Sequence, residues 1–182
     1  MSQMGFGFDP ARCFGCGACI VACQRENNLP QGIAWRRVEK LPPHDGRSDL
    51  EFLSWSCSHC QDPACLRACP AGAYTKDERG LVLHHPERCL GCRYCTWACP
   101  YGVPQYDERS GVVSKCHFCW HRLQAGQAPA CVETCMSRAL RYGPLEALEA
   151  EGATLQAHPA LPDPALTRPA LRLWPRRPGE LP

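Results

Sequence analysis

Four groups of four cysteines are the residues whose type and spacing could do chemistry in this chain of 182 residues. In residues 89–100, CLGCRYCTWACP, the gaps between cysteines are two, two and three residues, and a proline follows. We call each group a quartet, numbered in chain order, and no cysteine lies outside the four quartets. Their members are Cys13, Cys16, Cys19 and Cys23; Cys57, Cys60, Cys65 and Cys69; Cys89, Cys92, Cys95 and Cys99; and Cys116, Cys119, Cys131 and Cys135.

Three kinds of cysteine chemistry compete for this pattern. Disulfides fail because cysteines two residues apart in a tight loop rarely reach the Cα separation and Cβ orientation that a bridge needs. Zinc is a more serious alternative, since CxxC is a common zinc half-site, but a zinc ribbon would leave the third cysteine of a run unused. The run C-x2-C-x2-C-x3-C-P is typical of bacterial ferredoxins, in which the fourth cysteine ligates the other cluster of a pair. We therefore predict four [4Fe-4S] clusters.

Composition and charge exclude several classes of function. The formal net charge is +2 and no basic stripe is present, so we predict no nucleic-acid partner. The first residues, MSQMGFGFDPARC, lack the basic and apolar regions of a secretory signal, and no run of 18 apolar residues could cross a membrane. No nucleotide-binding loop or nucleophile–base arrangement occurs. We therefore expect a non-catalytic protein with no membrane span.

The sulfur content also predicts how the chain is stabilised and where positive charge is needed. Large apolar residues are too sparse for a conventional core, so the clusters themselves must hold the fold together. Each oxidised cubane carries about −2, so four would take the formal charge to about −6. Arg93 and Lys115 lie beside quartet cysteines and are our candidates for tuning cluster potentials. The alternative is that both are ordinary surface residues.

An internal repeat indicates the fold class. After quartets two and three, the chain passes through a helical turn into a hairpin whose turn is DERG or DERSG. Gly15, Gly17 and Gly91 provide positive φ for loops that curl around a cluster. We predict an α+β fold of two pseudo-symmetric bacterial-ferredoxin-like lobes, made of short helices and hairpins and stabilised by clusters. One lobe combines residues 1–31 and 112–151 with quartets one and four, and residues 57–111 form the other.

The remaining segments have compositions of their own. Residues 32–56 connect the lobes, and Ile33, Trp35, Leu50 and Phe52 suggest two short strands around the polar loop PPHDGRSD. Residues 139–142 should form a last strand and residues 144–150 a short helix. Residues 152–182 hold seven prolines and form an extended tail. The tail's apolar group, Leu171, Leu173 and Trp174, favours docking along a partner subunit over a solvated tail.

The order of the quartets and the phrases SWSCSHCQDPAC, GCRYCTWACPYGVPQY and LTRPALRL resemble a known family. They are similar to the iron–sulfur, electron-transfer subunit of dimethyl-sulfoxide-reductase-type molybdoenzymes of anaerobic respiration, a four-cluster ferredoxin-like family. One departure is Met136, where the family often has proline after the last cysteine. That substitution leaves ligation intact but puts the shielding of the adjacent cluster in doubt.

The resemblance implies that each cluster takes three cysteines from one quartet and one from another. We number the implied sites for later use. Site 1 is Cys13, Cys16, Cys19 and Cys135; site 2 is Cys116, Cys119, Cys131 and Cys23; site 3 is Cys57, Cys60, Cys65 and Cys99; site 4 is Cys89, Cys92, Cys95 and Cys69. In the family, the cluster corresponding to site 4 lies nearest the membrane anchor.

The function that the resemblance implies is a relay of single electrons. The relay would run between a molybdopterin-containing catalytic subunit and a quinone-reactive integral-membrane anchor, which places the chain peripherally on the prokaryotic cytoplasmic membrane. Two alternatives stay open: a soluble polyferredoxin serving a hydrogenase or formate dehydrogenase, and a zinc-structured interaction module. His84 and His85 could relay protons near site 4, although a plain strand-end position is the simpler interpretation.

Overall fold

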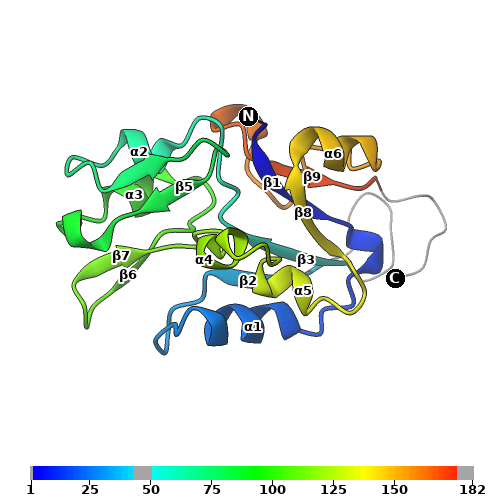
Figure 1. Cartoon of the computed structure of the whole chain (residues 1–182), viewed down its shortest axis with the longest axis horizontal. Coiled ribbons are helices and arrows are strands. Elements are labelled where there is room, and N and C mark those ends of the chain that lie inside the picture. Colours follow the sequence, from blue (N-terminus) through cyan, green and yellow to red (C-terminus); the bar gives the residue numbers. More distant parts are fainter. Residues whose placement is uncertain (1, 43–50, 176–182) are drawn as a thin grey trace.

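The computed structural model describes residues 2–42 and 51–175, and within them the chain is the predicted α+β mixture of short elements (Figure 1). The strands are β1 (Met4–Phe8), β2 (Arg36–Leu41), β3 (Glu51–Ser56), β4 (Tyr74–Lys76), β5 (Val82–His84), β6 (Gln105–Asp107), β7 (Val112–Ser114), β8 (Leu140–Pro144) and β9 (Leu171–Leu173). The helices are α1 (Ala18–Glu26), α2 (Ala64–Arg67), α3 (Tyr94–Ala98), α4 (Trp120–Gln124), α5 (Ala130–Glu133) and α6 (Leu145–Ala150). Short 3₁₀ turns occupy Pro10–Arg12, Pro86–Arg88 and Pro164–Leu166.

The two predicted hairpins that follow quartets two and three are present. β4 pairs antiparallel with β5, and β6 pairs antiparallel with β7. An aspartate closes each turn: Asp77 Oδ1 accepts from the Leu81 N–H at 2.8 Å, and Asp107 Oδ1 accepts from the Arg109 N–H at 3.0 Å. Gly80 and Gly111 take positive φ where the chain reverses. The DERG and DERSG repeat therefore encodes the same turn twice.

The connecting segment forms a third hairpin, β2–β3, with Arg36 opposite Ser56 and Leu41 opposite Glu51. Strand β2 begins at Arg36, later than the expectation built on Ile33 and Trp35. The reason is that residues before β2 contact another part of the chain, where the Ala34 N–H donates to the Gln105 side chain at 3.0 Å. Residues 43–50, which include most of the polar loop and Leu50 of the expected second strand, lie outside the described residues.

A three-stranded sheet with the order β8-β1-β9 joins the two ends of the chain. The β8 segment was predicted from sequence and β1 was not, and the tail was expected to cover a partner. In the structure β9 runs parallel to β1, with Phe6 opposite Leu171 and Phe8 opposite Leu173. Leu171 and Leu173 are buried, so the apolar residues of the tail pack on this chain's own sheet. Leu171 and Leu173 are thus already covered within this chain, and docking of the rest of the tail on a partner stays a prediction.

The elements are arranged so that the quartet loops extend along the molecule. Helices α2 and α3 with the β4–β7 hairpins lie at one end, and β1, β8, β9 and α6 lie towards the other (Figure 1). One hydrophobic cluster includes cysteines of the first, second and fourth quartets together with Phe6, Leu53 and Phe118. A smaller cluster surrounds Cys65 and Cys95 with Tyr74, Val82 and Val113. Cysteines are thus part of these two clusters, as a cluster-stabilised fold requires, whereas a third cluster of Leu145, Leu148, Ala153 and Ala170 contains none.

Candidate metal centres

All four quartets begin with a CxxC loop of one backbone shape. The residue before the second cysteine has positive φ in each loop: Gly15 at 72°, His59 at 44°, Gly91 at 66° and Phe118 at 63°. A left-handed residue at this point turns the backbone so that N–H groups face sulfur. The predicted positive φ of Gly15 and Gly91 is confirmed, and Gly17 has φ 74°.

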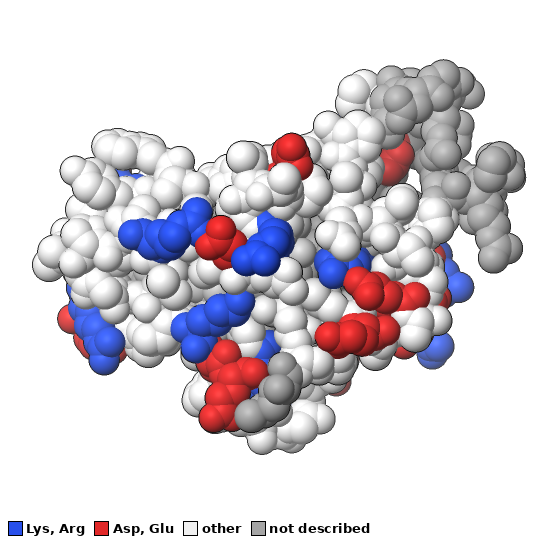
Figure 2. All heavy atoms as spheres, turned by 90° about the horizontal axis from the view of Figure 1, so that it is seen from above, with Lys and Arg blue, Asp and Glu red and all other residues white. Residues whose placement is uncertain are grey.

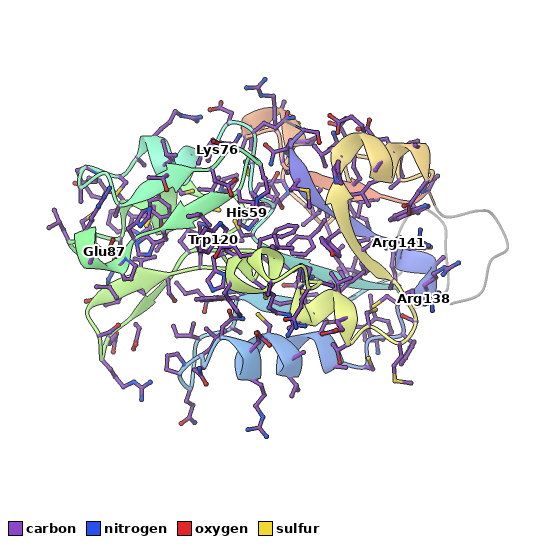
Figure 3. The ribbon with its side chains drawn as sticks, in the orientation of Figure 1. His59, Lys76, Glu87, Trp120, Arg138 and Arg141 are labelled. Atoms are coloured by element: carbon purple, nitrogen blue, oxygen red, sulfur yellow. The ribbon has the colours of Figure 1, made fainter. Side chains whose placement is uncertain are left out.

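His59 and Phe118 were not identified from sequence, because the glycine signal is missing at those positions. A left-handed conformation costs a non-glycine residue about 1–2 kcal/mol. Packing compensates for that cost, since both side chains are fully buried and their rings meet edge to face at 5.2 Å. The Val82 N–H donates to His59 Nδ1 at 3.0 Å, and Figure 3 shows His59 in the interior of the molecule. Burial, followed by the nearby Lys115 charge, lowers the pKa of His59 well below its ordinary value, so the ring is neutral.

Backbone and side-chain groups lie close to several quartet sulfurs. Main-chain N–H groups donate to Cys116 Sγ from Phe118 at 3.3 Å, to Cys69 Sγ from Ala73 at 3.4 Å and to Cys89 Sγ from Gly91 at 3.5 Å. Donors of this kind stabilise negative charge on sulfur, which is the form that ligates a metal. The loops are therefore preorganised for thiolate ligands.

The cysteines of site 1 line one cavity. Its volume is about 340 Å³, including part of the adjoining solvent, and Cys13, Cys16, Cys19 and Cys135 all border it. The first three come from the loop and first turn of α1, whereas Cys135 follows α5. Burial raises the pKa of the Cys13 thiol, and the neighbouring thiols of Cys19 and Cys135 raise it further.

The cysteines of site 3 line a second cavity, of about 380 Å³ on the same measure. Cys57, Cys60 and Cys65 belong to quartet two, and Cys99 arrives from quartet three. Burial raises the pKa of Cys65 to about 12, a rise that the ammonium group of Lys115 opposes. Lys115 also borders this cavity.

Sites 2 and 4 are indicated by the effect of neighbouring thiols on the pKa of individual cysteines. Burial raises the pKa of Cys23 to about 12, and the thiols of Cys131 and Cys119 raise it further. Cys116 is buried, with Cys23 and Cys131 among the thiols that raise its pKa. In site 4, the thiols of Cys69 and Cys89 act on Cys95 in the same way, and Cys92 is exposed on the same loop. The chain therefore brings cysteines of different quartets close together.

These thiols fit iron–sulfur clusters chemically. A buried thiol with a raised pKa keeps its proton at neutral pH, so ligation requires metal-derived positive charge to displace that proton. Soft thiolate donors suit iron in a cluster. Among the described residues, no group of three or more His, Cys, Asp or Glu side chains is placed to hold a single metal ion.

The two predicted tuning residues lie in different environments. Lys115 is buried, and its Nζ donates to the carbonyl oxygens of Val82 and, at 3.0 Å, Cys116. Arg93 is exposed and lies over the Tyr106 ring at 3.7 Å, with φ 64° at the start of α3. Arg36 is a third cation that the sequence analysis did not nominate, and it is 2 % exposed. Its position in a polar-looking strand, RRVEK, concealed its burial.

The histidines beside the quartets have partners of their own. Burial lowers the pKa of His84 and of His117 to about 4, so both rings are neutral. His85 Nε2 lies 2.8 Å from Thr75 Oγ1, and His121 Nε2 lies 2.7 Å from a carboxylate oxygen of Glu26. These contacts give each exposed histidine a structural role.

The surface carries charges of both signs. Lysine and arginine side chains alternate with aspartate and glutamate across the face drawn in Figure 2. In the part of the chain that the structure describes, none of the helices has the length and apolar character needed to cross a membrane.

Comparison with known proteins bears directly on these sites. Two family profiles described as a 4Fe-4S dicluster domain match residues 48–145 and 12–73. The protein is 40% identical over 183 residues to the probable anaerobic dimethyl sulfoxide reductase chain YnfG of Escherichia coli K12, covering 96% of this chain and 89% of the relative. It is 37% identical over 187 residues to an anaerobic dimethyl sulfoxide reductase chain of Haemophilus influenzae, with 97% and 91% covered. It is also 42% identical over 145 residues to the thiosulfate reductase electron transfer subunit PhsB of Salmonella typhi, with 78% and 76% covered.

Proposed function

Because the chain belongs to the iron–sulfur subunits of dimethyl-sulfoxide-reductase-type molybdoenzymes, we propose that it relays single electrons through four [4Fe-4S] clusters. The relay runs between a molybdopterin-containing catalytic subunit and a quinone-reactive integral-membrane anchor. The observation that carries this proposal is the grouping of cysteines from different quartets at two cavities. The chain itself provides ligands and insulation, and substrate chemistry belongs to the catalytic subunit.

The proposed ligands are the four sets defined above. Sites 1 and 3 each border a cavity, and the mutual effects of thiols on pKa support sites 2 and 4. A bound [4Fe-4S] cluster supplies one-electron chemistry at a potential that depends on charge, hydrogen bonds to sulfur and solvent access. The main-chain donors to Cys116, Cys69 and Cys89 stabilise negative charge on ligands of sites 2 and 4.

Lys115 is the proposed tuning residue of site 3. Its ammonium group is buried beside the cavity that Cys57, Cys60, Cys65 and Cys99 line. A positive charge held in a low-dielectric interior favours the state with one more electron, and so raises the reduction potential. Arg93 would do the same at site 4 more weakly, because solvent screens its exposed charge.

Exposed apolar side chains support docking at both ends of the relay. Leu90 and Trp97 are 74% and 76% exposed and lie in the quartet-three loop. Phe14 and Met136 are 55% and 89% exposed and flank cysteines of site 1. Large exposed apolar residues beside a functional site favour burial against another protein. We assign the Leu90–Trp97 surface to the membrane anchor, as the family's arrangement implies, and the Phe14–Met136 surface to the catalytic subunit.

The two surfaces lie at opposite ends of the molecule. Glu87, two residues before quartet three, is at one end in Figure 3, and Arg138, three residues after Cys135, is at the other. An elongated carrier with its terminal clusters at the two ends suits transfer between two different partners. The complex would hold the chain peripherally at the prokaryotic cytoplasmic membrane.

The test is anaerobic purification of the full complex, followed by iron and acid-labile sulfide analysis and EPR-monitored reduction. About sixteen irons per chain and four reducible clusters are expected. Cys92→Ser should disturb the site 4 signal and electron entry from a quinol analogue, while Cys16→Ser should disturb site 1 and leave quinol oxidation by site 4 intact. Zinc in place of iron, or co-purification with a hydrogenase and no molybdoenzyme, would show that the proposal is wrong.

A further inference from the structure

A buried arginine, Arg36, lies near cysteines of more than one site. Arg36 starts β2, and its Nη1 donates to Ser54 Oγ at 3.2 Å and its Nη2 to Ser56 Oγ at 2.9 Å. Its Nε has no hydrogen-bond partner, and within residues 2–42 and 51–175 no carboxylate forms an ion pair with it. A fully buried guanidinium without a counter-charge is energetically costly. The charge therefore needs a negative group that the carboxylates of the described residues do not supply.

Ser54 connects this arginine to a quartet sulfur. Its hydroxyl oxygen lies 3.5 Å from Cys19 Sγ, and both side chains are buried. A serine hydroxyl has one hydrogen to donate. Because the Ser54 oxygen already accepts from Arg36, that hydrogen is free to point at Cys19 Sγ. Ser54 also borders the site 1 cavity with Cys13, Cys16 and Cys135.

Arg36 faces thiols of two sites at once. Burial lowers its pKa, but the charges of Cys131, Cys19, Cys116 and Cys23 raise it by more. Cys19 belongs to site 1, and the other three belong to site 2. The Phe6 ring covers the guanidinium carbon at 4.8 Å and keeps solvent from it. The missing counter-charge is thus the thiolate ligands of two neighbouring clusters.

We propose that Arg36 is a positioning residue that raises the reduction potentials of the clusters at sites 1 and 2, and that Ser54 transmits a hydrogen bond from it to Cys19 at site 1 alone. This inference rests on the proposed four-cluster relay. Each transfer adds one electron, and so one negative charge, to the receiving site. A fixed buried cation and a hydrogen bond to sulfur both stabilise the more negative state.

Matched variants separate the two contributions. Ser54→Ala removes the hydroxyl that contacts both Arg36 and Cys19 and leaves the Arg36 charge in place. Arg36→Met removes the charge, and Arg36→Lys keeps the charge but loses the two-armed contact with Ser54 and Ser56. Arg37→Met is the control, because it removes the same charge one residue along the strand, where the guanidinium lies over Trp55 at 5.4 Å. Successive strand residues point to opposite faces, so Arg37 does not face these sites.

The measurement is an EPR-monitored potentiometric titration of the intact complex, with iron counted in every variant. Ser54→Ala should shift the reduced-to-oxidised ratio of the site 1 cluster about tenfold towards oxidised, which is about 59 mV for a one-electron couple. Arg36→Met should shift sites 1 and 2 in the same direction by at least that factor. Arg36→Lys should restore most of the site 2 potential but only the charge-dependent part of the site 1 potential. Site 4, and every site in Arg37→Met, should be unchanged.

The outcomes separate this inference from the proposed function. If the wild-type complex lacks four clusters, the relay itself is wrong, whatever the variants do. If Ser54→Ala keeps all its iron and its site 1 potential is unchanged, the inference is wrong while the relay stands. If Arg36→Met does not fold, the single-atom change in Ser54→Ala decides alone. Loss of iron from Ser54→Ala would overturn the tuning role in favour of a structural one.

Discussion

Replacement of Gly91 by alanine tests whether the quartet loops depend on both backbone conformation and close packing. Gly91 has φ 66°, and a Cβ added there would clash with the carbonyl oxygen of Gly111, in the turn before β7. Gly17 provides the matched control, because its φ is 74° and nothing lies within 4 Å of a Cβ added to it. Both substitutions impose the same left-handed strain, and only one adds a steric clash.

The magnitude follows from these two contributions. Left-handed backbone costs alanine about 1–2 kcal/mol at either position. The contact with Gly111 adds about 1–3 kcal/mol, a typical cost of overpacking, because a backbone carbonyl cannot rotate away as a side chain can. For a chain of this size, each kcal/mol lowers the unfolding midpoint by about 2–4 °C. On that scale we expect Gly91→Ala to lower it by about 4–20 °C and Gly17→Ala by about 2–8 °C.

The assay is loss of visible absorbance from the cluster-loaded protein during anaerobic heating, with iron content measured beforehand. Gly91→Ala should also lose the site 4 cluster first, because the Gly91 N–H donates to Cys89 Sγ at 3.5 Å and the clash moves that donor. Equal midpoints for the two variants, or loss of another cluster before that of site 4, would refute the reasoning. A non-glycine residue already occupies the position equivalent to Gly17 in quartet three, since Arg93 has φ 64°.

The remaining predictions concern the tail, a docking surface and the clusters. Leu173→Ala should destabilise the loaded chain by about 2–5 kcal/mol in thermal unfolding, because a buried leucine is truncated. Leu166→Ala, at an exposed position of the tail, should change stability by less than about 0.5 kcal/mol. Equal effects of the two substitutions would mean that a partner holds the tail. Trp97→Ser should leave iron content unchanged and reduce co-purification of the membrane anchor. Val21→Ser, at an exposed residue of α1, should leave that co-purification unchanged. Full co-purification of the anchor with the Trp97→Ser variant would contradict the docking assignment. Removal of iron should abolish near-ultraviolet circular dichroism, because cysteines contribute to the two hydrophobic clusters that surround the quartets. An unchanged spectrum would contradict cluster stabilisation.

Local patterns in the sequence were sufficient for the features that depend on neighbouring residues. The CxxC spacing indicated the class of cofactor, and the repeated turn signals predicted the β4–β5 and β6–β7 hairpins. Asp77 and Asp107 each close their turn with their own neighbours, so a few residues suffice to specify it. Glycine before the second cysteine predicted the loop shape at Gly15 and Gly91.

Long-range packing decided what those patterns could not. His59 and Phe118 take the same left-handed conformation as Gly15 and Gly91, yet only their burial against one another offsets its cost. The pairing of β1 with β9 joins residues far apart in the chain, such as Phe6 and Leu171. The residues of neither strand indicate which segment it pairs with.

By itself the sequence determined that this chain holds iron–sulfur clusters in CxxC loops, because ligand type and spacing are local properties. Only the tertiary structure decided which cations lie beside them. The sequence pattern of Arg36 and Arg37 in a polar strand is typical of two surface arginines. In the structure Arg36 is buried, because β3 places Ser54 and Ser56 against it. The electrostatic environment of a site is the sum over residues that the fold brings together, and spacing along the chain does not encode that sum.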